Sequence, residues 1–237
     1  MNIFLAGATG VIGRRLVPLL RDAGHAVIGT TRSEERAAAL QALGARAVVV
    51  DVYDARALLK AMVGAYPDVV IHQLTDLPDT LDPARAATVL EANARLRVEG
   101  TRNLMAAAQV TGARRVVAQS IAFGYAPKQG TLVETDPLDL DGERAVTARG
   151  VASLEQQVLD IPGIDGVVLR YGRLYGPGTW FAKPNGPGPL HVDAAAHAAL
   201  LAVTRGRGIY NVAEDDVAVS SEKAKRELGF DATFRLR

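Results

Sequence analysis

The chain has no cysteine, few aromatic residues and almost no net charge. The absence of cysteine excludes disulfides, thiolate metal sites and a cysteine nucleophile. A net charge of +1 and an aromatic content of 5% argue against a nucleic-acid or anionic-membrane partner. No apolar run approaches the length of a membrane span, and the first expected strand begins too early to leave room for a signal peptide. The absence of a targeting segment favours a cytoplasmic protein, whereas the absence of cysteine does not locate it.

Short β-branched runs alternate with longer alanine-rich stretches along the 237 residues. The expected strands cover residues 3–6, 26–30, 47–50, 68–72, 115–120, 166–170 and 208–212. Strands that are apolar throughout are buried on both faces, and strands separated by helices pair in parallel. The sequence therefore predicts a Rossmann-type, doubly wound α/β fold. Residues 1–165 would form the nucleotide-binding domain, and 166–237 a small, shortened substrate region interleaved with it in one structural unit.

Helix signals stand between these strands. Thr31 and Glu34 have the spacing of a capping box, which predicts a helix that Gly44 can end. A helix over 53–62 and a long helical stretch over 83–111 follow. Residues 126–141 and the proline-rich segment 176–190 are expected to be flexible.

A glycine turn directly follows the first expected strand and opens the first helix, as dinucleotide binding requires. Gly7 permits a tight turn, Gly10 lets the backbone approach a diphosphate, and Gly13 packs the helix against the strand. The helix start offers free N–H groups and a partial positive charge to phosphates. A glycine turn that binds nothing is the alternative, and the strand–turn–helix context disfavours it.

The end of the second strand distinguishes between two cofactors. An acidic residue there would bind the ribose hydroxyls of NAD, whereas an arginine suits the 2′-phosphate of NADP. The chain has Arg32 and no acid before Glu34, which favours NADP(H), with NAD(H) as the alternative. Asp51, after the third strand, is a candidate for the adenine amino group or for a helix cap.

Motifs along nearly the whole chain resemble the extended short-chain dehydrogenase/reductase superfamily, in its NAD-dependent epimerase/dehydratase group. They are the glycine turn 7–13, Asp51-Val52, 99–104, Ser120, 169–178, 191–193 and 210–212. The resemblance implies an NAD(P)-binding enzyme. Its expected cofactor-binding residues are Gly7, Thr9, Gly10, Val11, Ile12, Gly13, Arg32, Asp51, Val52, Leu74, Tyr171 and Gly172; no metal ligands are expected.

The chain departs from the family in the residues of proton transfer. The family uses a tyrosine, a lysine four residues later that lowers its pKa, and a serine that holds the substrate oxygen. Aligning on Glu155 puts Thr147 in the tyrosine position and Val151 in the lysine position, and no Tyr-x-x-x-Lys occurs anywhere. Arg97 replaces a frequent asparagine. Ser120 alone remains, so the chain resembles an atypical member.

Replacement acid–base groups would have to come from other positions. Tyr125, beyond the fifth strand, and Thr147 join Ser120 as catalytic candidates. Tyr171, Tyr175 and His72 are further candidates near the carboxyl ends of strands. For Tyr171 and Tyr175, a role in lining a nicotinamide pocket is favoured over catalysis. For His72, a structural role at the strand end with a hydrogen bond to the backbone is favoured.

Two functions remain open at this point. One is an NADP(H)-dependent oxidoreductase or epimerase that acts on a carbonyl compound or a nucleotide sugar with a rebuilt acid–base site. The other is a non-catalytic NADP(H) redox sensor, supported by an intact glycine turn without the tyrosine–lysine pair.

Two places in the second half are shorter than the family pattern. The chain passes quickly from Trp180 to His191 and from Asp216 to Ser221, so segments that cover a substrate are expected to be missing there. Either evolution removed them, or the written sequence omits loops. A homodimer through the alanine-rich stretch 98–110 is a further expectation.

Overall fold

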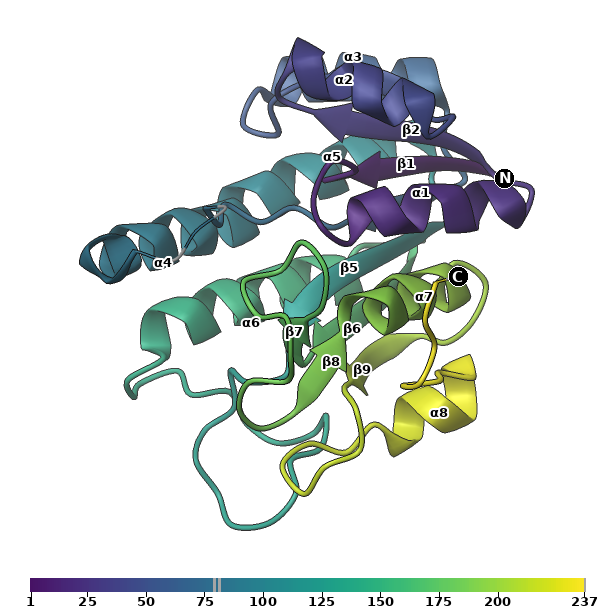
Figure 1. Cartoon of the computed structure of the whole chain (residues 1–237). Coiled ribbons are helices and arrows are strands. Elements are labelled where there is room, and N and C mark those ends of the chain that lie inside the picture. Colours follow the sequence, from purple (N-terminus) through teal and green to yellow (C-terminus); the bar gives the residue numbers. More distant parts are fainter. Residues whose placement is uncertain (79, 81, 237) are drawn as a thin grey trace.

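Seven parallel strands form one central sheet in the computed structural model, which describes residues 1–78, 80 and 82–236 (Figure 1). The order across the sheet is β3-β2-β1-β4-β5-β6-β9. The strands are β1 (Asn2–Ala6), β2 (Ala26–Thr31), β3 (Arg46–Val49), β4 (Val69–His72), β5 (Arg115–Ile121), β6 (Asp165–Tyr171) and β9 (Gly208–Val212). This sheet confirms the predicted fold class, and each of its strands overlaps a predicted one.

Helices cover both faces of the sheet (Figure 1). They are α1 (Gly13–Asp22), α2 (Glu34–Ala42), α3 (Ala55–Ala65), α4 (Ala86–Arg95), α5 (Thr101–Thr111), α6 (Ala145–Leu159), α7 (Val192–Ala202) and α8 (Glu222–Leu228), with a 3₁₀ turn, η1 (Pro83–Arg85), and a π-helical turn, η2 (Leu96–Gly100). Along β1, Ile3 and Leu5 join a cluster with α1, α7 and α8, whereas Phe4 and Ala6 join a cluster with α3, α5 and α6. Each strand thus contributes side chains to two cores.

The helix caps differ from the sequence expectation. Ser33, not Thr31, caps α2, because Thr31 is still part of β2 and its hydroxyl accepts from the Ser33 N–H. The predicted helix at 53 begins only at Ala55, since Asp54 accepts from the Ala57 N–H and takes the capping position. The capping box was therefore wrong: the strand runs one residue further and moves the helix start.

A second, two-stranded parallel sheet lies beyond β6. Its strands are β7 (Arg173–Tyr175) and β8 (Pro189–His191), and the second begins inside the segment expected to be a flexible loop. Gly172 lets β6 pass into β7, because a Cβ there would lie 2.2 Å from the Gly188 carbonyl oxygen. Strands of three residues carry too little alternation to be recognised in a sequence.

Tyr66 ends α3 in a left-handed conformation, with φ +45° and a residue that is 76% exposed. A Cβ makes this conformation unfavourable, while the exposed ring contributes little packing. Tyr66→Gly is expected to raise the free energy of unfolding by about 1 kcal/mol, the left-handed penalty less the added entropy of the unfolded chain.

Tyr66→Ala is the matched control in the same urea titration, since it removes the ring and keeps the Cβ. A gain in the alanine variant as large as that in the glycine variant would show that the ring, not the backbone, carries the cost.

Candidate functional site

The carboxyl ends of the parallel strands meet at one edge of the sheet. β1 lies between β2 and β4, so the chain turns in opposite directions after these neighbouring strands and leaves a crevice at that edge. The glycine turn follows β1 and faces this crevice. All sequence-predicted cofactor residues come from this edge, or from the start of α1 beside it.

Two glycines of the turn are required by its packing. Gly7 has φ +88°, and a Cβ on it would lie 2.6 Å from the Gln73 backbone beyond β4. A Cβ on Gly13 would lie 2.3 Å from the Gly7 carbonyl oxygen. Any side chain at either position would push α1 away from the sheet edge.

Gly10 is different, because it is exposed and the atom nearest to a Cβ placed there would be the Gly7 oxygen at 3.3 Å. The first turn of α1 has no acidic residue, and no side chain caps its start. An uncapped helix start beside an open glycine leaves amide N–H groups for an anion. These residues fit the diphosphate of a dinucleotide.

The neighbouring strands provide the surroundings for an adenosine. Arg32 follows β2 with a 64% exposed side chain, and its guanidinium lies 3.6 Å from the Asp76 carboxylate. Asp51 is exposed and accepts from the Tyr53 N–H at 2.9 Å, while the Val52 carbonyl accepts from Asn103. The exposed Arg32–Asp76 pair is weak, so a phosphate dianion could displace the carboxylate.

The end of β4 is held by buried side chains. His72 accepts from the Leu74 N–H through Nδ1 and lies 3.1 Å from the Thr101 hydroxyl through Nε2. Gln73 donates to the Tyr171 hydroxyl at 3.2 Å, and Gln119 donates to the Leu74 carbonyl. His72 therefore has the strand-end role that the sequence favoured.

A buried ion pair links β5, α6 and β6. Ser120 donates its hydroxyl to Glu155 at 2.7 Å, and Arg170 binds both carboxylate oxygens of Glu155 at 2.8 and 2.6 Å. The two charged side chains are at most 6% exposed. Burial by itself would lower the pKa of Arg170, but the bonds to Glu155 and its charge outweigh burial and raise it. In this arrangement the Ser120 hydroxyl donates its hydrogen bond to Glu155.

The other two catalytic candidates lie in different parts of the fold, one after β5 and one in α6. Tyr125 is 1% exposed, and its phenol donates to Asn211 of β9 at 2.6 Å. Burial, as the largest cause, raises the pKa of that phenol. Thr147 is partly buried in the first turn of α6, and Val151, one turn later, is fully buried. The geometry favours a structural role for Tyr125, because a proton donor must reach the reacting group.

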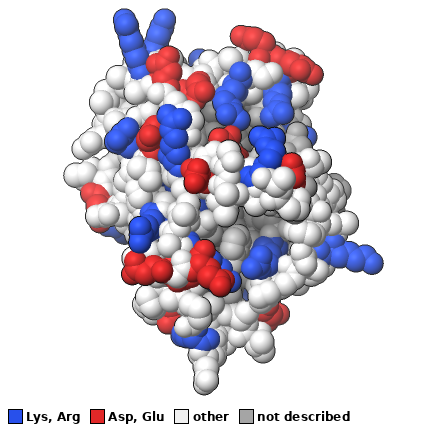
Figure 2. Space-filling model, turned by 90° about the vertical axis from the view of Figure 1, so that its left-hand side faces the viewer, with Lys and Arg blue, Asp and Glu red and all other residues white. Residues whose placement is uncertain are grey.

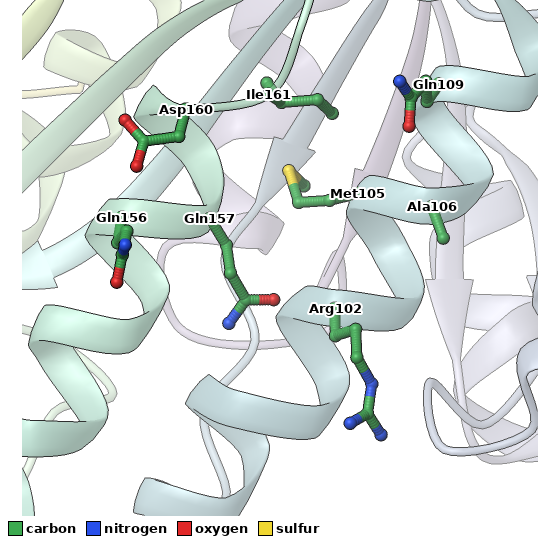
Figure 3. A pocket seen from close by; sticks show the side chains of 8 residues that line it. All are labelled: Arg102, Met105, Ala106, Gln109, Gln156, Gln157, Asp160 and Ile161. Atoms are coloured by element: carbon green, nitrogen blue, oxygen red, sulfur yellow. The ribbon is translucent and has the colours of Figure 1, made fainter.

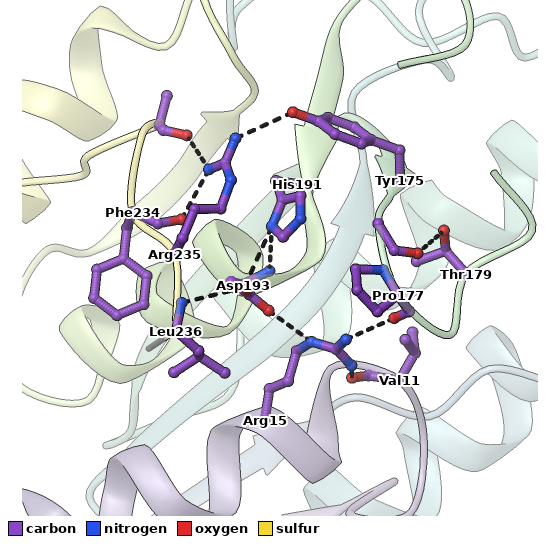
Figure 4. Close-up of polar contacts among 12 residues, drawn as sticks. Val11, Arg15, Tyr175, Pro177, Thr179, His191, Asp193, Phe234, Arg235 and Leu236 are labelled. Carbon is purple, nitrogen blue, oxygen red and sulfur yellow. Dashed lines mark hydrogen bonds and ion pairs between the residues drawn. The ribbon is translucent and has the colours of Figure 1, made fainter. Parts of the chain in front are cut away.

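A polar cluster ties α1 to the substrate region (Figure 4). Arg15 donates to Asp193 at 2.7 Å and to the Pro177 carbonyl at 2.6 Å. Tyr175 donates to Glu214, and Arg235 binds both. The loop after β7 is thereby held over the start of α1. Sequence reasoning missed these partners, since the bonds join residues far apart in the chain.

Trp180, the single tryptophan, closes a second contact across this edge. Its indole N–H donates to the Pro78 carbonyl at 3.0 Å, which joins the loop after β7 to the segment after β4. A hollow of about 190 Å³ lies beside Pro78, against the first residues of α4.

A larger groove of about 400 Å³ lies between α5 and α6, lined by Met105, Gln109, Gln157 and Ile161 among others (Figure 3). Met105 and Gln109 lie on α5, Gln157 lies in the last turn of α6, and Ile161 follows that helix. None of the lining residues is among those predicted to bind the cofactor or to act in catalysis.

Basic and acidic side chains are interspersed on the face shown in Figure 2. In the described part of the chain, no helix is long and apolar enough to span a bilayer. Within residues 1–78, 80 and 82–236, no group of three metal-ligating side chains occurs.

The fold and the glycine turn together define a dinucleotide-binding Rossmann protein. A family model described as the NAD dependent epimerase/dehydratase family matches residues 3–192. The chain belongs to this family, and it is an enzyme of the NAD(P)-dependent epimerase and reductase type.

Two curated relatives are reductases. A 3-diazoavenalumate denitrifying reductase from a Streptomyces species is 42% identical over 246 positions, covering 94% of this chain and 79% of the relative. A 4-hydroxy-2-methyl-3-oxo-4-farnesyl-3,4-dihydroquinoline-1-oxide ketoreductase from Stigmatella aurantiaca is 31% identical over 74% of this chain and 51% of its own length. The 246 aligned positions exceed the 237 residues of this chain, so the first relative contains internal residues that this chain lacks.

Solved structures share the fold at low identity. UDP-glucose 4-epimerase from Thermotoga maritima, solved with UDP-glucose, has a TM-score of 0.81 at 17% identity, covering 99% of this chain and 94% of its own. The UDP-glucose 4-epimerase from Thermus thermophilus, solved with NAD, has a TM-score of 0.79 at 18% identity, with coverage of 100% and 95%.

The burial of His72 makes the stability of the folded protein depend on pH. Burial, with the charge of Arg97 as the smaller cause, lowers the pKa of His72 from 6.5 to about 4. Below pH 6.5 His72 binds a proton in the unfolded chain but stays neutral in the folded chain. The free energy of unfolding therefore decreases as the pH falls from 6.5 toward 4. The expected loss is on the order of 3 kcal/mol.

His72→Gln should flatten the dependence of the urea midpoint on pH over this window. The pKa values of His25, His191 and His197 are lowered too, so the difference between wild type and variant isolates His72. Parallel profiles for the two proteins would contradict the assignment.

Proposed function

We propose that this enzyme is an NADP(H)-dependent reductase whose substrate accepts a hydride without a proton from a tyrosine–lysine pair. The observation that carries the proposal is an intact dinucleotide turn beside a site with valine in the lysine position. The phenols of Tyr125 and Tyr171 are at most 2% exposed and hydrogen-bonded within the protein.

The residues that would hold the cofactor come from the strand ends described above. Amides around Gly10 would bind the diphosphate, Arg32 the 2′-phosphate and Asp51 the adenine amino group. Tyr171 and the backbone at Leu74 would border the nicotinamide. When bound, NADPH supplies a hydride. The chain's own contribution is to position the acceptor and to exclude water.

The type of acceptor decides whether a proton donor is needed. A carbonyl that takes up a hydride becomes an alkoxide, which must be protonated. A diazonium group that takes up a hydride and releases dinitrogen leaves a neutral C–H bond, so its charge balances without a proton. The 42%-identical relative is named for the reductive denitrification of a diazo compound. We therefore propose a diazonium acceptor that carries a carboxylate.

Arg32 is expected to set the cofactor preference. Arg32→Ala should weaken NADPH binding by about tenfold or more, because a charge-assisted bond to the 2′-phosphate is lost, and should leave NADH binding unchanged. Isothermal titration of both dinucleotides measures the two effects.

Gly10→Asp should abolish binding of both dinucleotides while the protein stays folded, and Arg56→Ala, an exposed arginine of α3, is the charge control. An equal loss for NADPH and NADH in Arg32→Ala would remove the basis for NADP specificity.

The acceptor is tested with 4-carboxybenzenediazonium and NADPH. The expected products are NADP⁺, benzoate and dinitrogen in equal amounts, detected by absorbance, chromatography and mass spectrometry. A panel of ketones and a UDP-sugar provides the comparison.

Turnover of ketones but not of the diazonium would overturn the choice of acceptor. Tight NADPH binding without turnover of any compound would favour the redox sensor instead.

A further inference from the structure

Arg97 lies in the π-helical turn η2, which interrupts the helical stretch between α4 and α5. Such turns often occur at functional sites. One turn earlier, Ala94 packs against α6 so closely that a Cβ on Gly150 would lie 3.0 Å from the Ala94 Cα. Arg97 acts electrostatically on His72 at the end of β4, and Glu155 of α6 acts on Arg97, so its side chain lies near the strand ends and α6.

The Arg97 side chain is mostly buried and has no partner among the described residues. It is 8% exposed, and no residue in the described ranges forms a hydrogen bond or ion pair with its guanidinium. The nearest anion that acts on it, Glu155, is already bound by Arg170 and Ser120. Burial lowers the pKa of Arg97 to about 10, so the side chain still carries its charge at neutral pH.

The nitrogens of Arg97 are not sealed from solvent, so a ligand can reach the guanidinium although most of the side chain is buried. The neighbouring positions show that apolar residues are accommodated here, since Leu96 and Val151 are both buried. Arg97 therefore does not stabilise the fold through a contact of its own. An unpaired guanidinium beside the strand ends is suited to an anionic ligand.

The chemistry of the group identifies that ligand. A guanidinium cannot act as a proton donor near neutral pH, but its planar fork matches the two oxygens of a carboxylate. We propose that Arg97 binds the carboxylate of the acceptor and provides the positive charge at the position where the family's lysine is absent. This inference rests on the proposed function, and it adds a residue that recognises the acceptor.

The test measures binding and stability separately from turnover. Benzoate and benzamide are titrated into the protein saturated with NADP⁺, with the fluorescence of Trp180 as the signal. Wild type is expected to bind benzoate at least about tenfold more tightly than benzamide. Arg97→Met should remove that preference, and Arg97→Lys should keep part of it. Arg102→Met, an exposed arginine on α5, should behave as wild type.

The melting temperature of the ligand-free protein provides the second measurement. Arg97→Met should not lower it, because the variant loses no bond between the guanidinium and a described residue. An unchanged benzoate preference in Arg97→Met, a weakened NADP⁺ affinity in its place, or a lower melting temperature overturns the inference. Failure of the wild-type protein to bind NADP⁺ would instead contradict the proposed function. The failure of this inference and the failure of the proposed function are therefore distinguishable.

Discussion

The close approach of α1 to the end of β1 is the constraint on which the site depends. Gly13 lies against the Gly7 carbonyl, and Gly7 lies against the backbone after β4, so the first helix begins at the sheet edge. The parallel order of β2, β1 and β4 then brings the ends of β2 and β4 to the same edge. A cofactor site at this edge follows from backbone geometry before any side chain is considered.

Two buried arginines near this edge illustrate opposite uses of charge. Arg170 is fully paired: both oxygens of Glu155 accept from it, and Ser120 donates to the same carboxylate. Removing one partner of such a pair leaves a charge that nothing compensates. Arg97 differs, because it forms no bond to a described residue and its nitrogens are not sealed from solvent. The first arginine stabilises the junction of β5, β6 and α6, whereas the second leaves part of its interactions to a ligand.

The fold could be predicted from the sequence because strands buried on both faces are apolar throughout, and each was found within a few residues. The cap at Ser33 and the short strand β8 were missed, since both depend on where neighbouring segments pair rather than on local pattern. The site was predictable only in part. The glycine turn has a fixed spacing, but the bonds of Tyr125 to Asn211 and of Ser120 to Glu155 join segments distant in the chain. Arg97 was visible as an unusual residue, while its burial was not.

Among the described residues, the strand ends combine the positive charge of Arg97 with a buried histidine and two phenols that are hydrogen-bonded inside the protein. His72 is neutral and fully buried, and the phenols nearest the strand ends are committed to internal bonds. An electrostatic environment of this kind favours reactions in which the substrate's charge changes without proton transfer to or from the protein. With the proposed diazonium acceptor, a proton donor at the position of Thr147 would serve no step, so that reaction does not require the tyrosine–lysine pair.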